Sequence, residues 1–266
     1  MSGLDLRERA AGRGPVDRLW LLVVALLFAL PGLAAPAPGK SAIASAHPLA
    51  TAAGMEILAR GGNAFDAAVA VSAALAVVEP NGSGMGGGGF YLLHRASDDR
   101  QVVVDAREVA PAAATRDMFL DTSGNPVDGL STRHAKAAGI PGEPAGWAHL
   151  ARNYGRLPLA VSLEPAIRLA RQGFVIDASM QRDLQRVIAD EGLDKGADPS
   201  FARIFLVNGK VPPVGHRLRQ PALARSLEVL AEGGADAFYR GPFAQKLVAG
   251  VQSLGGIWTV ADLAGY

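Results

Sequence analysis

A long apolar segment constrains the fold more than any other feature of the chain. Residues 64–78 read AFDAAVAVSAALAVV, in which only Asp66 and Ser72 are polar. A helix that is apolar on nearly every face must be covered by other elements on nearly every face, and its alanines let those elements approach closely. We therefore expect a buried central helix. It ends before Pro80, because the residue preceding a proline disfavours helical geometry.

Another helix is predicted immediately before this one. Apolar residues recur at helical spacing within residues 49–57. The pair Gly61-Gly62 ends that helix, because glycine readily adopts the left-handed conformation found past a helix C-terminus. Asn63 then fits the N-cap of the buried helix, with Asp66 three residues later, as in a capping box.

The segment NGSGMGGGGF, residues 81–90, holds six glycines. Its spacing matches G-x-G-x-x-G, the fingerprint of dinucleotide sites. That fingerprint requires a preceding strand and a following helix, so that the helix N-terminus meets the pyrophosphate. Here a predicted helix precedes the glycines and the strand-like run FYLLHR follows them. We therefore expect tight turns and close backbone packing beneath a site, and no nucleotide.

The runs FYLLHR and QVVVDAR flank the polar tetrapeptide ASDD and predict a β-hairpin. Arg107 falls where the second strand ends, between Asp105 and Glu108. A guanidinium offers a planar pair of donors that matches a carboxylate with two parallel hydrogen bonds, and residues at strand ends commonly take part in binding. On local pattern alone, an ordinary ion pair with a neighbouring acid is the favoured interpretation.

Helical patterns dominate the rest of the chain and are separated by Gly or Pro. They cover residues 142–154, 162–172, 179–190, 221–232 and 243–253, and TRDMFLD (115–121) predicts a single helical turn. The order of a helix pair, a hairpin and further helices predicts mixed α and β layers instead of regular βαβ alternation.

Composition and motifs exclude several kinds of chemistry. The chain has no cysteine, which excludes disulfides, cysteine-ligated metals and a thiol nucleophile. Its net charge is +1 with no basic run beyond the N-terminus, so no nucleic-acid partner is expected. The five histidines lack metal-ligand spacing, and no G-x-S-x-G or S-x-x-K motif occurs. We therefore predict no metal, no cofactor and no catalytic nucleophile within this sequence.

The N-terminal residues have the pattern of an export signal. Arg18 precedes LWLLVVALLFAL, a run of uncharged residues shorter than the roughly 20 needed to span a bilayer. Pro31 breaks the run and small residues follow it. We predict a signal peptide over residues 1–35 and a mature portion over residues 36–266, with an uncleaved anchor as the alternative. The protein would then be periplasmic or secreted, without stable membrane association after cleavage.

Six blocks, taken in order, carry a resemblance to a known family. They read SAHPLATAAGMEILARGGNAFDAAVAVSAALAVVEP, SGMGGGGF, DAREVAPAAATRDMF, GIPGEPAGW, YGRLPLAVSLEPAIRLARQGF and ADAFYRGPFAQKLV. From about Ser41 to Tyr266 the chain resembles the N-terminal part of the large subunit of gamma-glutamyltranspeptidases, also called glutathione hydrolases. The resemblance implies an α+β fold. This is the αββα sandwich of N-terminal-nucleophile hydrolases, with two stacked antiparallel sheets between helical layers, here present only in part.

The resemblance also implies an activity. In this family a precursor cleaves itself into large and small subunits, and the N-terminal threonine of the small subunit attacks the γ-glutamyl carbonyl. The γ-glutamyl group then passes to water, or to an amino acid or peptide. The expected partners are a γ-glutamyl substrate such as glutathione and the small subunit. Arg107 matches the family arginine that grips the substrate α-carboxylate, and Asp105 and Glu108 look like supports that orient it.

The sequence stops at Tyr266, inside what the resemblance implies is the large subunit. The nucleophilic threonine is therefore expected outside it. This portion alone is expected to be inactive and to expose apolar surface that the other part covers. The leading interpretation is an incomplete γ-glutamyltransferase and hydrolase. The alternatives are a non-catalytic exported remnant that binds γ-glutamyl groups or glutamate, and a dinucleotide-dependent enzyme that rests on the glycines alone.

Overall fold

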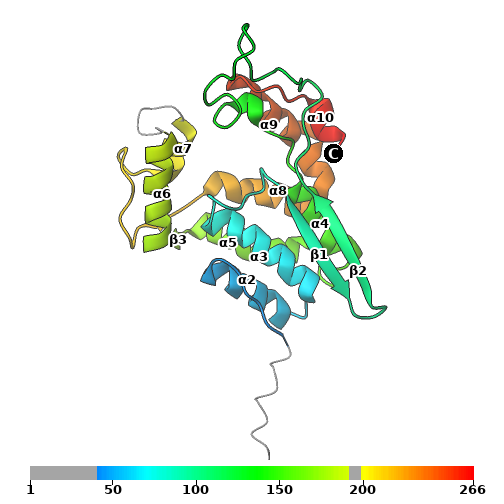
Figure 1. Ribbon diagram of the computed structural model, residues 1–266. Coiled ribbons are helices and arrows are strands. Elements are labelled where there is room, and N and C mark those ends of the chain that lie inside the picture. Colours follow the sequence, from blue (N-terminus) through cyan, green and yellow to red (C-terminus); the bar gives the residue numbers. More distant parts are fainter. Residues whose placement is uncertain (1–40, 192–198) are drawn as a thin grey trace, which may run out of the picture. The chain divides into compact units, whose positions relative to one another are not determined.

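The helix predicted to be buried lies at the centre of the fold. In the computed structural model, α3 (Ala64–Val78) packs against α2 (Pro48–Ala59), α4 (Glu143–Asn153) and α5 (Leu159–Gln172) (Figure 1). Five of the alanines of α3 are buried, and their small side chains allow the neighbouring helices to lie close. The expectation of a central helix covered on most of its faces is confirmed.

The structure describes residues 41–191 and 199–266, and residues 43–266 form one unit. The signal peptide predicted over residues 1–35 lies outside the described residues. Within the described ranges, no helix is both long enough and apolar enough to cross a membrane.

The start of α3 follows the capping pattern expected from the sequence. Gly61 has φ +92° and carries the chain away from α2. The Asn63 side chain accepts a hydrogen bond from the Asp66 amide, and the Asp66 carboxylate accepts one from the Asn63 amide at 2.8 Å. This reciprocal capping box satisfies amides that have no partner inside the helix.

The predicted hairpin consists of β1 (Gly89–Arg95) and β2 (Arg100–Ala106), paired in antiparallel register with Gly89 opposite Ala106. The tetrapeptide ASDD forms the turn over residues 96–99. Because β2 ends at Ala106, Arg107 is the first residue beyond the strand, as predicted.

The two faces of the hairpin lie in different environments. Leu93 and Ala106 are buried on the face that packs toward the helices. On the opposite face Phe90, Leu92 and Val103 are 61%, 76% and 64% exposed. Helices therefore cover one face of this sheet, while its other face, which also carries His94, Gln101 and Asp105, is open within the described residues. This arrangement is the one expected of an αββα sandwich present only in part, and the α+β class is confirmed.

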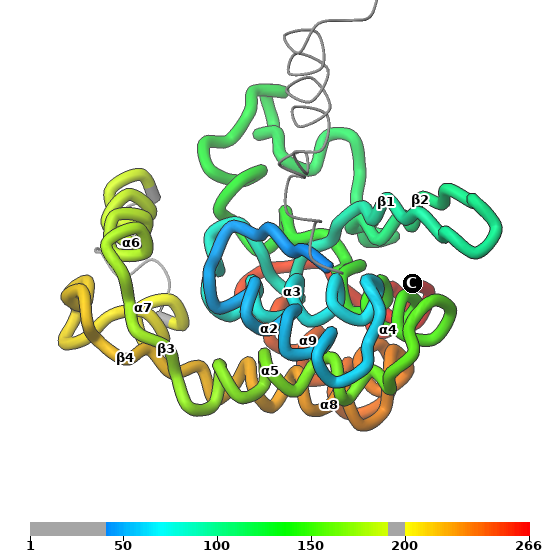
Figure 2. The backbone as a smooth tube through the Cα atoms, turned by 90° about the horizontal axis from the view of Figure 1, so that it is seen from below, coloured from blue at the N-terminus to red at the C-terminus, as the bar shows by residue number. Residues whose placement is uncertain are grey.

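The remaining elements complete the helical part of the fold. In chain order they are η1 (Ala135–Ala137), β3 (Phe174–Val175), α6 (Ala178–Glu191), α7 (Pro199–Phe205), β4 (Arg217–Leu218), α8 (Pro221–Tyr239), α9 (Gly241–Ser253) and α10 (Val260–Ala264). β3 and β4 pair antiparallel, and α8 packs against both α5 and α9. Figure 2 shows α6 and α7 to one side of the helices that surround α3.

The five longer helices predicted from periodicity are present as α4, α5, α6, α8 and α9. The predicted end of α8 at its glycine pair is a kink, where Gly234 has φ 64° and the helix then resumes. The single helical turn predicted over residues 115–121 is wrong, because these residues form turns instead. The short helices α7 and α10 were not predicted, since elements of one or two turns carry little periodic signal.

Candidate functional site

Glycine backbones pack against the end of β2. A β-carbon added to Gly88 would overlap the carbonyl oxygen of Ala106, and one added to Gly142 would overlap the same oxygen. The Gly87 carbonyl accepts hydrogen bonds from the amides of Gly142 (2.9 Å) and Glu143 (3.0 Å). The glycine loop follows a helix and precedes a strand, so it lacks the context of a nucleotide fingerprint. Through these contacts and hydrogen bonds, the glycine loop holds the end of β2 against the start of α4.

The backbone of Arg107 is held on both sides by side chains. Asp105 Oδ1 accepts a hydrogen bond from the Arg107 amide at 2.9 Å, and the Tyr266 phenol donates one to the Arg107 carbonyl, also at 2.9 Å. The Arg107 side chain is 66% exposed, and its Nε lies 2.7 Å from Glu108 Oε2. The structure thus brings the three predicted residues together. Glu108 contacts the guanidinium, whereas Asp105 contacts the backbone.

The ion pair leaves much of the guanidinium open. In the described part of the chain, no acid other than Glu108 forms an ion pair with Arg107. Glu108 Oε2 is buried and has no hydrogen-bond donor of suitable geometry among the described residues, so the charge of Arg107 is what offsets it. A fork-shaped cation that is fixed at its base and open at its tip can bind a small carboxylate with two hydrogen bonds.

A buried carboxylate that the sequence analysis did not single out lies beneath the hairpin. Glu143 is 7% exposed, and its Oε1 accepts hydrogen bonds from the hydroxyls of Ser72 and Tyr91 and from the Trp147 indole, the last at 2.8 Å. Burial, reinforced by Glu143, raises the pKa of Tyr91 well above its ordinary value. The cluster ties α3, β1 and α4 together. Ser72, a polar residue inside an apolar helix, was the sequence signal that could have revealed it.

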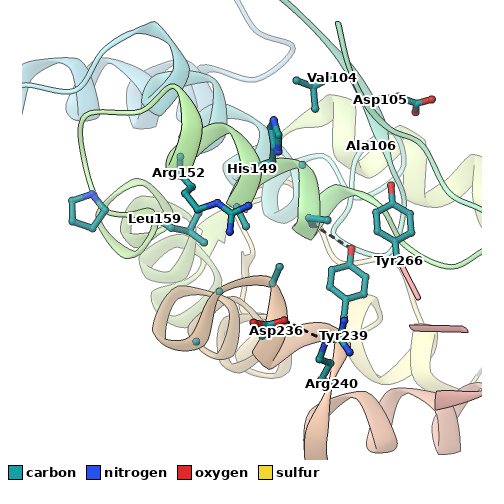
Figure 3. A pocket seen from close by; sticks show the side chains of 18 of the residues that line it. Val104, Asp105, Ala106, His149, Arg152, Leu159, Asp236, Tyr239, Arg240 and Tyr266 are labelled. Atoms are coloured by element: carbon teal, nitrogen blue, oxygen red, sulfur yellow. Dashed lines mark hydrogen bonds and ion pairs between the residues drawn. The ribbon is translucent and has the colours of Figure 1, made fainter. Parts of the chain in front are cut away.

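A pocket of about 890 Å³ lies between β2, α4 and the end of α8 (Figure 3). Its polar wall residues come from all three elements and from the C-terminal residue: Asp105, His149, Arg152, Asp236, Tyr239, Arg240 and Tyr266. Arg240 pairs with Asp236 at 3.3 Å. Arg107 is not among the residues that line this pocket, but Asp105 and Tyr266, which hydrogen-bond to its backbone, do line it.

Two stacked tyrosines form one corner of the pocket. The rings of Tyr239 and Tyr266 lie 5.4 Å apart with an interplanar angle of 8°. The Tyr239 hydroxyl donates to the Pro141 carbonyl at 2.7 Å and accepts from the Ala145 amide at 3.2 Å. Burial raises the pKa of both phenols. A phenol is protonated at neutral pH even at its ordinary pKa of about 10, so both hydroxyls can act as donors.

Metal ligands do not converge at this site. Among the residues that the structure describes, His, Asp and Glu side chains form no group of three that could hold a metal ion. What the end of β2 offers is the exposed guanidinium of Arg107, on a backbone that hydrogen bonds hold in place.

Comparisons with known proteins show which family and which relatives this chain resembles. The family described as Gamma-glutamyltranspeptidase matches residues 50–266. The chain is 42% identical over 224 residues to the glutathione hydrolase proenzyme of Escherichia coli (strain K12), covering 84% of this chain and 38% of the relative. It is 40% identical over 238 residues to the Acylase ACY 1 proenzyme of Pseudomonas sp. (strain SE83), covering 87% of this chain and 42% of the relative.

A solved structure agrees with these matches. The gamma-glutamyltranspeptidase of Helicobacter pylori aligns with a TM-score of 0.80 and 37% sequence identity, covering 86% of this chain and 66% of that one. The chain spans less than half the length of the two curated relatives.

Proposed function

The chain belongs to the gamma-glutamyltranspeptidase family, and on this basis we propose that the complete protein cleaves γ-glutamyl amide bonds. It passes the γ-glutamyl group to water, or to an amino acid or peptide, with glutathione as a representative substrate. Because the chain spans 38% of the Escherichia coli relative, the activity is assigned to the complete protein and not to these residues alone.

The proposal rests on the position of Arg107, the exposure of its side chain and the hydrogen bonds that hold its backbone. It is the first residue after β2, its side chain is 66% exposed, and its backbone amide and carbonyl are both hydrogen-bonded to side chains. A γ-glutamyl group ends in an α-carboxylate, which a guanidinium binds with two parallel charge-assisted hydrogen bonds. We assign this contact to Arg107.

Holding the α-carboxylate places the scissile bond. The γ-carbonyl lies a fixed number of bonds from the α-carboxylate, so anchoring one end restricts where the other end can sit. Positioning of this kind can supply a large part of a catalytic barrier reduction. Glu108 supports the contact by orienting the guanidinium at 2.7 Å, and Asp105 supports it by holding the Arg107 amide at 2.9 Å.

The remaining chemistry is assigned to other parts of the protein. In this family the nucleophile is the N-terminal threonine of a small subunit that is released from the same precursor. The open face of the hairpin, with its exposed apolar residues Phe90, Leu92 and Val103, is suited to be covered by another part of that precursor. We also propose that residues 1–35 direct export, with residues 36–266 forming the mature large-subunit portion in the periplasm or outside the cell.

The test uses the complete protein and a chromogenic γ-glutamyl anilide. Release of the aniline, which is faster when an acceptor dipeptide is present, is the expected result. The α-carboxamide analogue of the substrate, which lacks the charge that Arg107 would bind, should be turned over poorly. Equal turnover of the two substrates would argue against the assigned role of Arg107. Binding of glutamate without turnover would favour the non-catalytic alternative.

A second candidate is acylase activity on a different amide. The observation that favours it is the 40% identity to the Acylase ACY 1 proenzyme, a value close to that for the glutathione hydrolases. A cephalosporin acylase from Bacillus halodurans also aligns with this chain, with a TM-score of 0.74 and 30% sequence identity. Acyl-cephalosporin cleavage measured beside γ-glutamyl anilide cleavage therefore separates the two candidates. A protein that cleaves the cephalosporin amide and leaves the γ-glutamyl anilide intact would be an acylase.

A further inference from the structure

Tyr266 lies 159 positions after Arg107 in the chain, and its phenol donates a hydrogen bond to the Arg107 carbonyl at 2.9 Å. We propose that Tyr266 is a positioning residue for carboxylate recognition by Arg107. It fixes the backbone from which the guanidinium projects and does not itself touch the substrate. This inference rests on the proposed function, because it assigns Tyr266 a role in the same substrate contact.

The phenol is itself held in place. The Tyr266 ring stacks on Tyr239 at an angle of 8°. Tyr239 is 5% exposed, and its hydroxyl is bonded to both Pro141 and Ala145 at the start of α4. Arg107 is therefore supported by Tyr266, and Tyr266 in turn stacks on Tyr239. The Tyr239 side chain is buried and hydrogen-bonded at the start of another element, α4.

The surrounding chain leaves room for this contact. A β-carbon added to Gly142 would overlap the Tyr266 hydroxyl oxygen as well as the Ala106 carbonyl. The absence of a side chain at Gly142 thus lets the phenol reach the backbone at the strand end. The geometry is specific, since any larger residue at position 142 would collide with both the phenol and the end of β2.

The hydrogen bond from Tyr266 restricts the direction in which the Arg107 side chain projects. With its amide bonded to Asp105 and its carbonyl bonded to Tyr266, the two peptide planes that flank Arg107 resist rotation. A long, exposed side chain amplifies small rotations at its base. Loss of the phenol would let the guanidinium sample more directions in the free enzyme, and binding would then have to overcome more conformational entropy.

The test compares the complete protein with its Tyr266→Phe variant, which keeps the stacked ring and removes only the hydroxyl. We expect KM for the γ-glutamyl anilide to rise roughly fivefold, the scale of ordering one more flexible side chain on binding, with kcat within about twofold of its original value. Turnover of the α-carboxamide analogue should not change. The matched control is Tyr154→Phe, because the Tyr154 ring packs on Phe65 and its hydroxyl has no hydrogen-bond partner recorded among the described residues.

Failure of the inference can be told from failure of the proposed function by including Arg107→Lys. If that variant leaves KM unchanged, the role of Arg107 is wrong. If it raises KM while Tyr266→Phe does not, the positioning role is overturned and the role of Arg107 stands. A lower melting temperature of Tyr266→Phe with KM unchanged also overturns it. In the double variant, Tyr266→Phe should add little to the effect of Arg107→Lys if the two residues act as one unit.

Discussion

Arg107 Nε lies 2.7 Å from Oε2 of Glu108, the residue that follows it in the chain. The carboxylate oxygen is buried, while the arginine side chain is 66% exposed. An acid placed at the base of an exposed guanidinium restrains it before a ligand arrives and leaves its outer nitrogens available. The sequence pattern allowed two interpretations of Arg107, an ion pair with a neighbouring acid and a carboxylate-binding role. This geometry is compatible with both.

Replacing Arg107 with Lys should weaken binding of a γ-glutamyl substrate by about 1.5–3 kcal/mol, the scale of a charge-assisted hydrogen bond. An ammonium keeps the positive charge but loses the planar two-point contact with a carboxylate. The measurement is the apparent affinity of the complete protein for a γ-glutamyl anilide. The control is Arg225→Lys on α8, where the arginine is exposed and has no ion pair recorded among the described residues. An effect of equal size at both positions would contradict a specific role for Arg107.

Gly88→Ala should destabilise the protein and lower its activity. The added methyl group would overlap the Ala106 carbonyl and lie 2.9 Å from the Arg107 Cα. The strand end must then move, at a cost of about 1–3 kcal/mol for overpacking. The shift would also displace the backbone that carries Arg107. Chemical denaturation measures the change in stability, and the anilide assay measures the change in activity.

Gly86→Ala is the matched control for Gly88→Ala. Gly86 belongs to the same loop, but a β-carbon there would meet nothing within 4 Å. We expect its stability and activity to stay close to those of the unmodified protein. If both variants lost stability equally, the loss would come from the backbone freedom of the loop and not from its packing against the strand end.

The sequence was sufficient for features whose cause is local. The apolar run over residues 64–78, the capping residues Asn63 and Asp66, and the turn over residues 96–99 follow from periodicity and backbone chemistry within a few positions. Placing Arg107 at a strand end required only the end of a β-rich run. These features were all predicted, and the structure contains them.

Features that depend on residues far apart in the chain could not be predicted from local patterns. The phenol of Tyr266 reaches Arg107 across 159 positions, and Glu143 of α4 gathers Ser72 from α3 and Tyr91 from β1. No spacing rule links such positions, because the packing of helices on the hairpin brings them together. The sequence alone showed only that some apolar segments contain polar residues.

The buried phenol of Tyr91 predicts a loss of stability at high pH. Burial, together with Glu143, raises the pKa of this phenol in the folded protein above its value of about 10 in the unfolded chain. Its contribution to stability is therefore fully present below pH ~10. It is lost as the pH rises toward the folded pKa, at about 1.4 kcal/mol per pH unit.

The free energy of unfolding measured between pH 8 and pH 12 (a range of roughly four units around the tyrosine pKa) tests this prediction. The original protein should lose stability more steeply than Tyr91→Phe, which has no phenol to ionise at this position. The variant should also be less stable at neutral pH, since Glu143 loses one of its three donors. Parallel pH profiles for the two proteins would show that Tyr91 is not the group responsible.

The carboxylate of Asp66 links two parts of the chain. It is fully buried and accepts hydrogen bonds from the amides of Asn63 (2.8 Å), Arg156 (2.9 Å) and Leu157 (3.3 Å). The first bond completes the capping box of α3. The other two hold the loop that leads into α5, 90 positions further along the chain. Both oxygens therefore act as acceptors.

Asp66→Asn should destabilise the protein by about 1–3 kcal/mol, because an amide has only one oxygen and would leave a buried backbone donor facing its NH2 group. Urea denaturation of the complete protein measures the loss. Asp121 is the control, since its carboxylate also accepts bonds from two backbone amides, those of Ser123 and Asn125, but is exposed to water. Both of these amides bond to Oδ1, which an asparagine keeps, and water can solvate the NH2 group that replaces Oδ2, so Asp121→Asn should remain close to the original stability. Equal losses at the two positions would show that a buried backbone donor left without an acceptor does not set the cost.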